Sequence, residues 1–79
     1  MHRQLNPEPL PPDPEEMNEA RAIWAGDAIA VFRRETGTDL EDAVSDLMAD
    51  LMHWCDRNGQ EFDVELDRAR YHYGCETED

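Results

Sequence analysis

Four aspartates recur at helical spacing in the middle of the chain. They are Asp39, Asp42, Asp46 and Asp50, separated by three, four and four residues. Residues at these separations lie along one side of a helix, and four residues advance the helix by about 6 Å. That repeat is comparable to the path between successive phosphates of a nucleic-acid strand, whose axial rise is about 3.4 Å before the sideways displacement is added. The pattern fits either a solvated face or a surface that imitates nucleic acid and complements a basic groove.

More acidic residues extend this negative surface towards the C-terminus, and they belong to the same predicted partner-binding site. The four aspartates of residues 39–50 lead, and three further acids support them. These three are Glu61, Asp63 and Asp67.

The sequence indicates a catalytic or metal-binding site less clearly than it indicates an acidic surface. Asp50 and His53 have the carboxylate–histidine spacing found in di-metal bundles, and His72 could approach them, but the second such motif is missing. Cys55 lies two residues from His53 and points to another face, so the two make no nucleophilic pair. We therefore predict no catalytic residue, no metal site and no cofactor, and we expect Cys55 to be a buried thiol.

One enzymatic alternative remains. The pair Glu16-x-x-Glu19 followed by Asp39-x-x-Asp42 is similar to the acidic motifs that hold Mg²⁺ in all-α nucleotide pyrophosphohydrolases of the MazG type. The second motif in that family is E-x-x-D, and its helical unit is longer than this chain. Acids at helix starts are also expected for capping alone. The alternative to an interaction protein is therefore a metal-dependent nucleotide hydrolase.

Composition narrows the classes of partner. The 79 residues include 20 Asp and Glu, 7 Arg and no Lys, for a formal net charge of −13. Direct binding to a nucleic-acid backbone or to an anionic membrane is disfavoured, because both rely on basic side chains. Residues 1–16 contain no apolar stretch of a secretory signal, so we expect a cytoplasmic protein. Seven Arg without any Lys fit a GC-rich bacterial genome, so the expected host is bacterial.

The elements that must position these acids are helical. All five prolines lie within residues 6–14, and residues 1–13 are predicted to form a flexible, extended arm. Helices are predicted at about 14–36, 39–57 and 63–73, giving a three-helix domain over 14–74 and an acidic tail over 75–79. Asp13 is expected to cap the first helix. A Thr38–Glu41 capping box is expected to cap the second, with Asp39 as the competing cap. Gly37, Asn58–Gly59 and Gly74 are expected to end the three helices. The fold class is all-α, a three-helix bundle with an extended proline-rich N-terminal arm.

Apolar residues at three- and four-residue spacing identify the expected core. The first helix contributes Met17, Ala20, Trp24, Ala28, Val31 and Phe32, and the second repeats apolar residues from Leu40 through Trp54 to Cys55. Trp54 is assigned to the core because of its position in this pattern; if exposed, it is an aromatic anchor for a partner. A domain this small is marginally stable alone, so a homodimer is a second possibility. The apolar residues left over to close it include Ile23, Met52, Val64 and Tyr71.

The stretch DLMADLMHWCDRNGQEFDVELDRARYHY (residues 46–73), preceded by ETGTDLED at residues 35–42, has a specific pattern. It resembles a family of small acidic helical proteins from proteobacterial plasmids, prophages and integrative elements, and the match covers about half the chain. Small acidic proteins of such elements often inhibit host defence, and anti-CRISPR proteins are the best-known class. Many of those occupy a basic channel of the surveillance complex.

Charge and resemblance together lead to one expected function. The chain is expected to be a non-enzymatic, anti-CRISPR-like inhibitor that docks its acidic helical face on a basic nucleic-acid-binding surface of a host defence complex, such as a subunit of a CRISPR surveillance complex. The alternative within the same class is a regulatory partner of a mobile-element DNA-processing protein, also recognised through basic surface.

Overall fold

The computed structural model describes residues 9–78, which form three α-helices and no strand. They are α1 (Asn18–Thr36), α2 (Leu40–Arg57) and α3 (Phe62–Thr77). The predicted all-α three-helix bundle is confirmed. Residues 9–12 have no regular secondary structure, as expected of the proline-rich arm, whereas residues 1–8 of that arm and residue 79 of the predicted tail lie outside the described residues. None of the helices in the described range is both long and apolar enough to cross a membrane.

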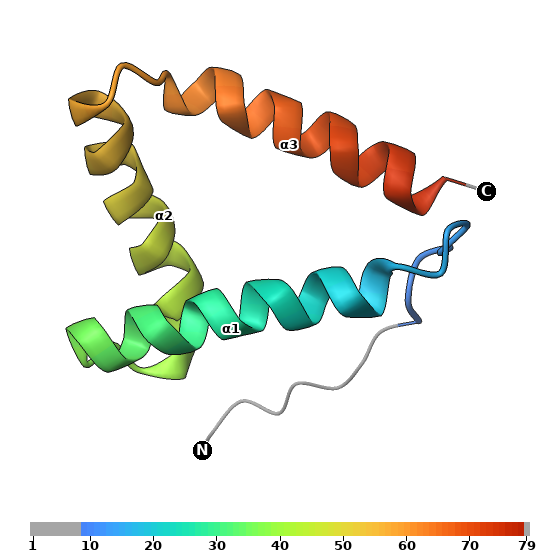
Figure 1. The fold of residues 1–79 in the computed structure, drawn as a ribbon, viewed down its shortest axis with the longest axis horizontal. Helices are drawn as coiled ribbons and strands as arrows, with labels where there is room; N and C mark the ends of the chain where they lie inside the picture. Colours follow the sequence, from blue (N-terminus) through green and yellow to red (C-terminus); the bar gives the residue numbers. More distant parts are fainter. Residues whose placement is uncertain (1–8, 79) are drawn as a thin grey trace.

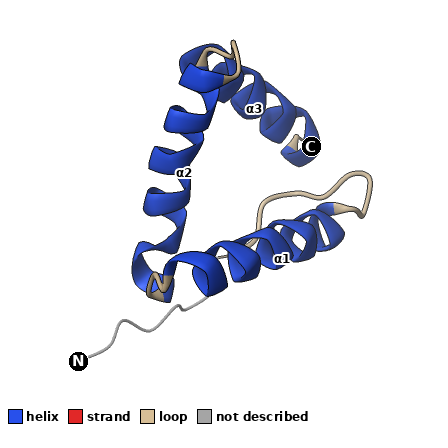
Figure 2. Ribbon diagram, turned by 60° about the vertical axis from the view of Figure 1, so that its left-hand side comes forward, coloured by secondary structure: helices blue, strands red, loops and turns tan. Residues whose placement is uncertain are grey.

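The bundle is open. The three helices form the sides of a flat, triangular frame and meet near their ends instead of along their lengths (Figures 1 and 2). The frame measures 38 × 37 × 19 Å, and its radius of gyration is 14.6 Å, compared with about 12 Å for a compact domain of this length. Side-by-side antiparallel packing, which short connections usually produce, is therefore replaced by three corners.

The first helix begins four residues later than predicted, because a turn precedes it. The backbone N–H of Glu16 donates to the carbonyl oxygen of Asp13 (3.1 Å), and Glu16 adopts a left-handed φ of 57°. Asp13 still caps the helix across this turn. Its carboxylate accepts hydrogen bonds from the backbone N–H groups of Met17 (3.1 Å) and Asn18 (3.2 Å), which have no partner within the helix.

The corner between α1 and α2 follows the predicted stop at Gly37. Gly37 has a φ of 73°, and its N–H donates to the carbonyl oxygen of Arg33 (2.8 Å). The predicted Thr38–Glu41 capping box is wrong. Asp39 occupies the N-cap position of α2 without a side-chain cap bond, and the Thr38 hydroxyl pairs with that of Thr36 instead (2.8 Å).

The corner between α2 and α3 also forms where the sequence indicates it. The N–H groups of Asn58 and Gln60 both donate to the carbonyl oxygen of Cys55, and Gly59 has a φ of 68°. Cys55 is buried here, and Ala43 is fully buried in the first turn of α2, where α2 meets α1. These two side chains are the only buried ones among residues 9–78, so α2 is anchored at both ends and little in between.

The third corner joins the two ends of the described chain and explains why α3 runs four residues beyond its predicted end. The Asn18 side-chain amide donates to the backbone carbonyl of Glu76 (2.9 Å), and Arg21 Nε lies 3.3 Å from Glu76 Oε2. Arg21 also pairs with Glu15 (2.8 Å), and this hydrogen bond, with the nearby Glu76 charge, raises the pKa of Arg21. Contacts with α1 hold the last turn of α3, so Gly74 continues the helix at the usual modest cost of a mid-helix glycine.

Candidate interaction surface

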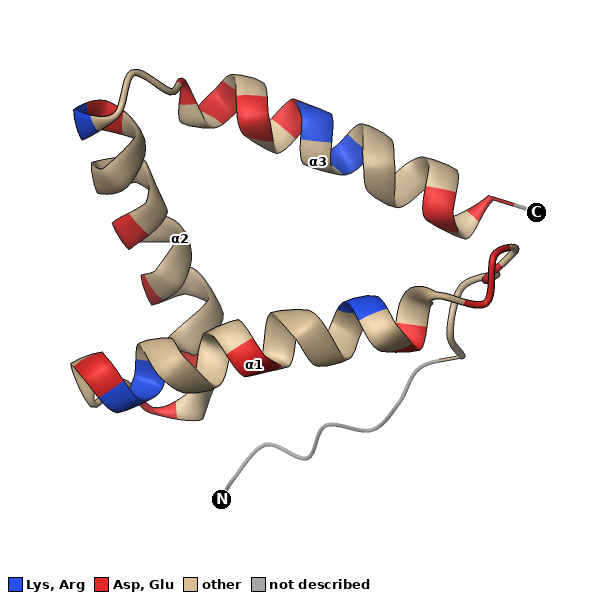
Figure 3. Cartoon of the chain, in the orientation of Figure 1, with Lys and Arg blue, Asp and Glu red and all other residues tan. Residues whose placement is uncertain are grey.

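The four leading aspartates lie along one side of α2, with Asp39 at its N-cap. We call Asp39, Asp42, Asp46 and Asp50 the acidic side of α2. All four are exposed. Asp42, Asp46 and Asp50 follow one another at four-residue intervals, so their Cα atoms are about 6 Å apart along the helix axis. Figure 3 shows acidic positions recurring down the length of α2.

None of these four carboxylates is neutralised by a basic side chain of residues 9–78. The ion pairs in that range join Arg21 to Glu15 and Glu76, and Arg68 to Glu65. Arg57 lies at the end of α2, yet its guanidinium donates to the backbone carbonyl oxygen of His53 (3.1 Å) and forms no ion pair. Like charges one helical turn apart destabilise a helix slightly. The acidic side of α2 thus carries repulsion that the described chain does not relieve.

The three supporting acids are also exposed, but they belong to another part of the frame. Glu61 is the N-cap residue of α3, and Asp63 and Asp67 lie one turn apart in the first half of that helix. Since α3 leads away from α2, these acids continue the negative surface around the α2–α3 corner without joining the acidic side of α2 in one cluster (Figure 3).

Charge is distributed unevenly among the helices. Helix α1 contains three acids and three arginines, so its formal side-chain charge is zero. Helix α2 contains five acids and a single arginine. Helix α2 therefore has a formal side-chain charge of −4, and a basic partner would be attracted to α2 more strongly than to α1 itself.

The residues considered for metal chemistry do not converge. Residues 9–78 contain no group of three or more His, Cys, Asp or Glu side chains that could hold a metal ion. The two acidic pairs that resemble a pyrophosphohydrolase motif flank α1 at opposite ends. A nineteen-residue helix is about 28 Å long, so Glu16 and Glu19 cannot share an ion with Asp39 and Asp42 of the same chain.

The structure corrects the assignment of the core. Trp54 is 54% exposed, so its predicted placement in the core of the chain is wrong. Trp24 and Val31 of α1 are also exposed, whereas Cys55 is buried as predicted. Apolar residues are arranged at core spacing, but an open frame has too few helix–helix contacts to cover them.

A groove that the sequence did not indicate lies at the third corner, with a volume of about 800 Å³. The arm and the facing ends of α1 and α3 line it, with Leu10 and Pro11 on one side and Tyr73 and Thr77 on the other. Its position depends on the return of α3 to the start of α1, a tertiary contact with no local sequence signal.

Comparison with models of protein families, with curated proteins and with solved structures found no match for this chain.

Proposed function

We propose that this chain is a non-enzymatic interaction protein that inhibits a host defence complex of the CRISPR type, by docking the acidic side of α2 on a basic nucleic-acid-binding surface. The observation that carries the proposal is that four exposed carboxylates share one side of a helix, with no ion pair to the rest of the described chain. A partner rich in arginine and lysine supplies the missing counter-charges.

The chemistry of such docking is electrostatic. A basic channel that binds nucleic acid attracts a strongly negative protein over several ångströms, which speeds association and makes it depend on ionic strength. The repeat of about 6 Å along α2 allows successive carboxylates to meet basic side chains spaced for phosphates. Glu61, Asp63 and Asp67 extend the negative field around the neighbouring corner.

The test is a pull-down with the tagged protein from host lysate containing an active CRISPR system, followed by binding to the captured complex after purification. The test variant changes Asp42, Asp46 and Asp50 to Asn. A matched control changes three acids of α1, Glu19, Asp27 and Glu35, to Gln, Asn and Gln, so both variants lose the same net charge.

The test variant is expected to bind about 10- to 100-fold more weakly, since each exposed charge pair contributes about 0.5–1 kcal/mol. Its binding is also expected to depend less on salt than that of the wild type, while the control changes little. Equal weakening of both variants would show that net charge alone acts, and unchanged binding of the test variant would refute the docking mode. Capture of a relaxase, partition protein or repressor, in place of a surveillance-complex subunit, would replace the proposed target with a mobile-element protein.

A further inference from the structure

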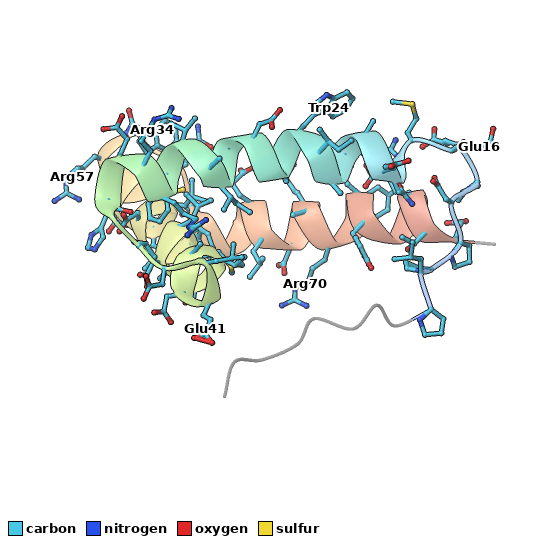
Figure 4. The ribbon with its side chains drawn as sticks, turned by 90° about the horizontal axis from the view of Figure 1, so that it is seen from below. Glu16, Trp24, Arg34, Glu41, Arg57 and Arg70 are labelled. Atoms are coloured by element: carbon cyan, nitrogen blue, oxygen red, sulfur yellow. The ribbon has the colours of Figure 1, made fainter. Side chains whose placement is uncertain are left out.

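Helix α1 carries a second apolar stripe that its own chain does not cover. The inner stripe contains Ile29 and Phe32, which are half-buried. The outer stripe contains Met17 at the N-cap, Trp24 and Val31, which are 38%, 61% and 48% exposed. Trp24 projects from one flat face of the frame and not towards α3, which lies behind α1 in this view (Figure 4). Closing the frame within its own plane would therefore not bring α2 or α3 over Trp24.

A helix that is apolar on nearly all sides is normally buried on nearly all sides. Between Ala22 and Phe32 the only charged residue of α1 is Asp27. The outer stripe occupies an arc of about 80° around the helix, and no charged side chain lies in this arc between Met17 and Val31. We call this set the outer stripe of α1; its members are Met17, Ala20, Trp24, Ala28 and Val31.

The exposed area indicates how much surface is missing a partner. The chain exposes 7026 Å², whereas a folded monomer of this mass exposes about 4,900 Å². Residues 1–8 can account for at most about 1,500 Å² of this area, which leaves about 5,500 Å² for residues 9–79. A folded monomer of the mass of residues 9–79 exposes about 4,600 Å², so the excess is about 900 Å². One partner in a stable protein dimer buries about 800 Å², so the excess over the whole open frame is of the same order as the contribution of one subunit.

The spacing of the outer stripe is symmetric about Trp24. Met17 and Val31 are each seven residues from Trp24, and Ala20 and Ala28 are each four residues from it. We propose that two copies of this chain associate through antiparallel α1 helices, with a two-fold axis passing close to Trp24. Met17 then faces Val31 of the second copy, Ala20 faces Ala28, and the small alanines leave room for the two indole rings.

Charge selects the antiparallel arrangement. The segment before α1 is acidic, with Glu15 and Glu16, and the last turn of α1 is basic, with Arg33 and Arg34. Arg34 is exposed and forms no ion pair with residues 9–78. In an antiparallel pair each acidic start lies beside the basic end of the other α1, and the helix dipoles oppose each other. A parallel pair would place acids beside acids.

This interface and the acidic side of α2 respond to salt in opposite directions. Each copy carries −13, so long-range repulsion opposes association of two copies, and salt screens it. The dimer should therefore tighten as salt rises, whereas docking of α2 on a basic partner should weaken. The dimer does not depend on the proposed function, and either can fail alone.

The first test is sedimentation velocity of the full chain over a wide range of concentration. The wild type is expected to reach twice the 9.2 kDa of one chain, and Trp24→Glu to remain at 9.2 kDa with unchanged helicity. The milder Trp24→Ala change should raise the dissociation constant at least about 30-fold, as expected for a central aromatic anchor. Tyr71→Glu is the matched control, because Tyr71 is 71% exposed on α3 and should leave the dimer intact.

A second test fixes the geometry and does not depend on a destabilising variant. In a background with Cys55→Ala and Cys75→Ser, Ala20→Cys and Ala28→Cys chains are mixed and oxidised. Disulfides between positions 20 and 28 should dominate. A wild type that stays monomeric at all concentrations would overturn the proposal. So would disulfides that join like positions, or a dimer that Tyr71→Glu dissociates and Trp24→Glu does not.

Discussion

Helices α1 and α2 have nearly the same length and meet at one corner, yet they present opposite kinds of surface to the solvent. Helix α1 has no net formal charge and exposes an apolar outer stripe. Helix α2 has five acids against one arginine and exposes a row of carboxylates. Exposure of the apolar stripe to water raises the free energy of the folded chain, and so does repulsion between the neighbouring carboxylates of α2.

Each helix therefore lacks a different kind of partner. An apolar stripe of symmetric spacing is satisfied by a copy of itself, because a two-fold axis brings the same residues together. A row of carboxylates repels its own copy and requires a basic partner. Self-association through α1 and docking through α2 are therefore compatible, and the dimer would present two acidic sides.

The largest change in stability is expected at Ala43, the fully buried residue of α2 that contacts α1. Ala43→Asp places a carboxylate at the fully buried contact with α1, and should reduce the free energy of unfolding by more than about 3 kcal/mol, because the charge has no counter-ion there. Ala49→Asp, at an exposed position of the same helix, has the same loss of helix propensity and lies beside other carboxylates, so it should cost only about 1 kcal/mol. Urea unfolding followed by circular dichroism compares them. Equal losses would mean that the α1–α2 corner is not formed.

A smaller change in stability is expected from removing the aspartates at the beginnings of α1 and α2. Asp13→Ala removes the acceptor of two N–H groups at the start of α1 and should cost about 1 kcal/mol, while Asp13→Asn should retain most of the cap. Asp39→Ala should cost less, because Asp39 makes no side-chain cap bond at the start of α2. Thermal unfolding of the three variants provides the ranking, and a larger loss for Asp39→Ala would contradict it.

The smallest effect concerns α3. The side chain of Cys75, one turn further along the helix, raises the pKa of Tyr71 above its ordinary value of 10.0. A raised folded-state pKa favours the neutral phenol, so its contribution to stability is present below pH 10 and is lost as the pH rises through the folded-state pKa. Cys75→Ala should bring the pKa of Tyr71 back towards 10.0 in a Tyr73→Phe background, followed by ultraviolet absorbance. Cys55→Ala should leave it in place, and an equal fall in both variants would exclude the Cys75 contact as the cause.

Local signals in the sequence were sufficient for the helices and for the acidic side of α2. Gly37 and Asn58–Gly59 end helices as predicted, because a glycine with a left-handed backbone conformation ends a helix without help from the rest of the fold. The row of aspartates is likewise a property of one helix. The end of α3 was missed because it depends on Asn18 and Arg21, which are more than fifty residues away along the chain.

The core could not be predicted from spacing alone. Periodicity shows that Trp24 and Trp54 lie on apolar faces, but not whether the same chain covers those faces. The signal that was available is the near absence of a polar face on α1, which indicates a helix covered on two sides. The arrangement of Met17, Ala20, Ala28 and Val31 around Trp24 is also visible in the sequence, although its meaning requires knowing which side of α1 faces outward.

The most direct test of this division between α1 and α2 is one sedimentation velocity experiment at low and high salt. It compares the wild type, Trp24→Glu and the variant with Asp42, Asp46 and Asp50 changed to Asn. The wild type and the triple variant are predicted to form dimers that tighten with salt, while Trp24→Glu stays at the mass of one chain. A dimer that survives Trp24→Glu but dissociates in the triple variant would contradict the account.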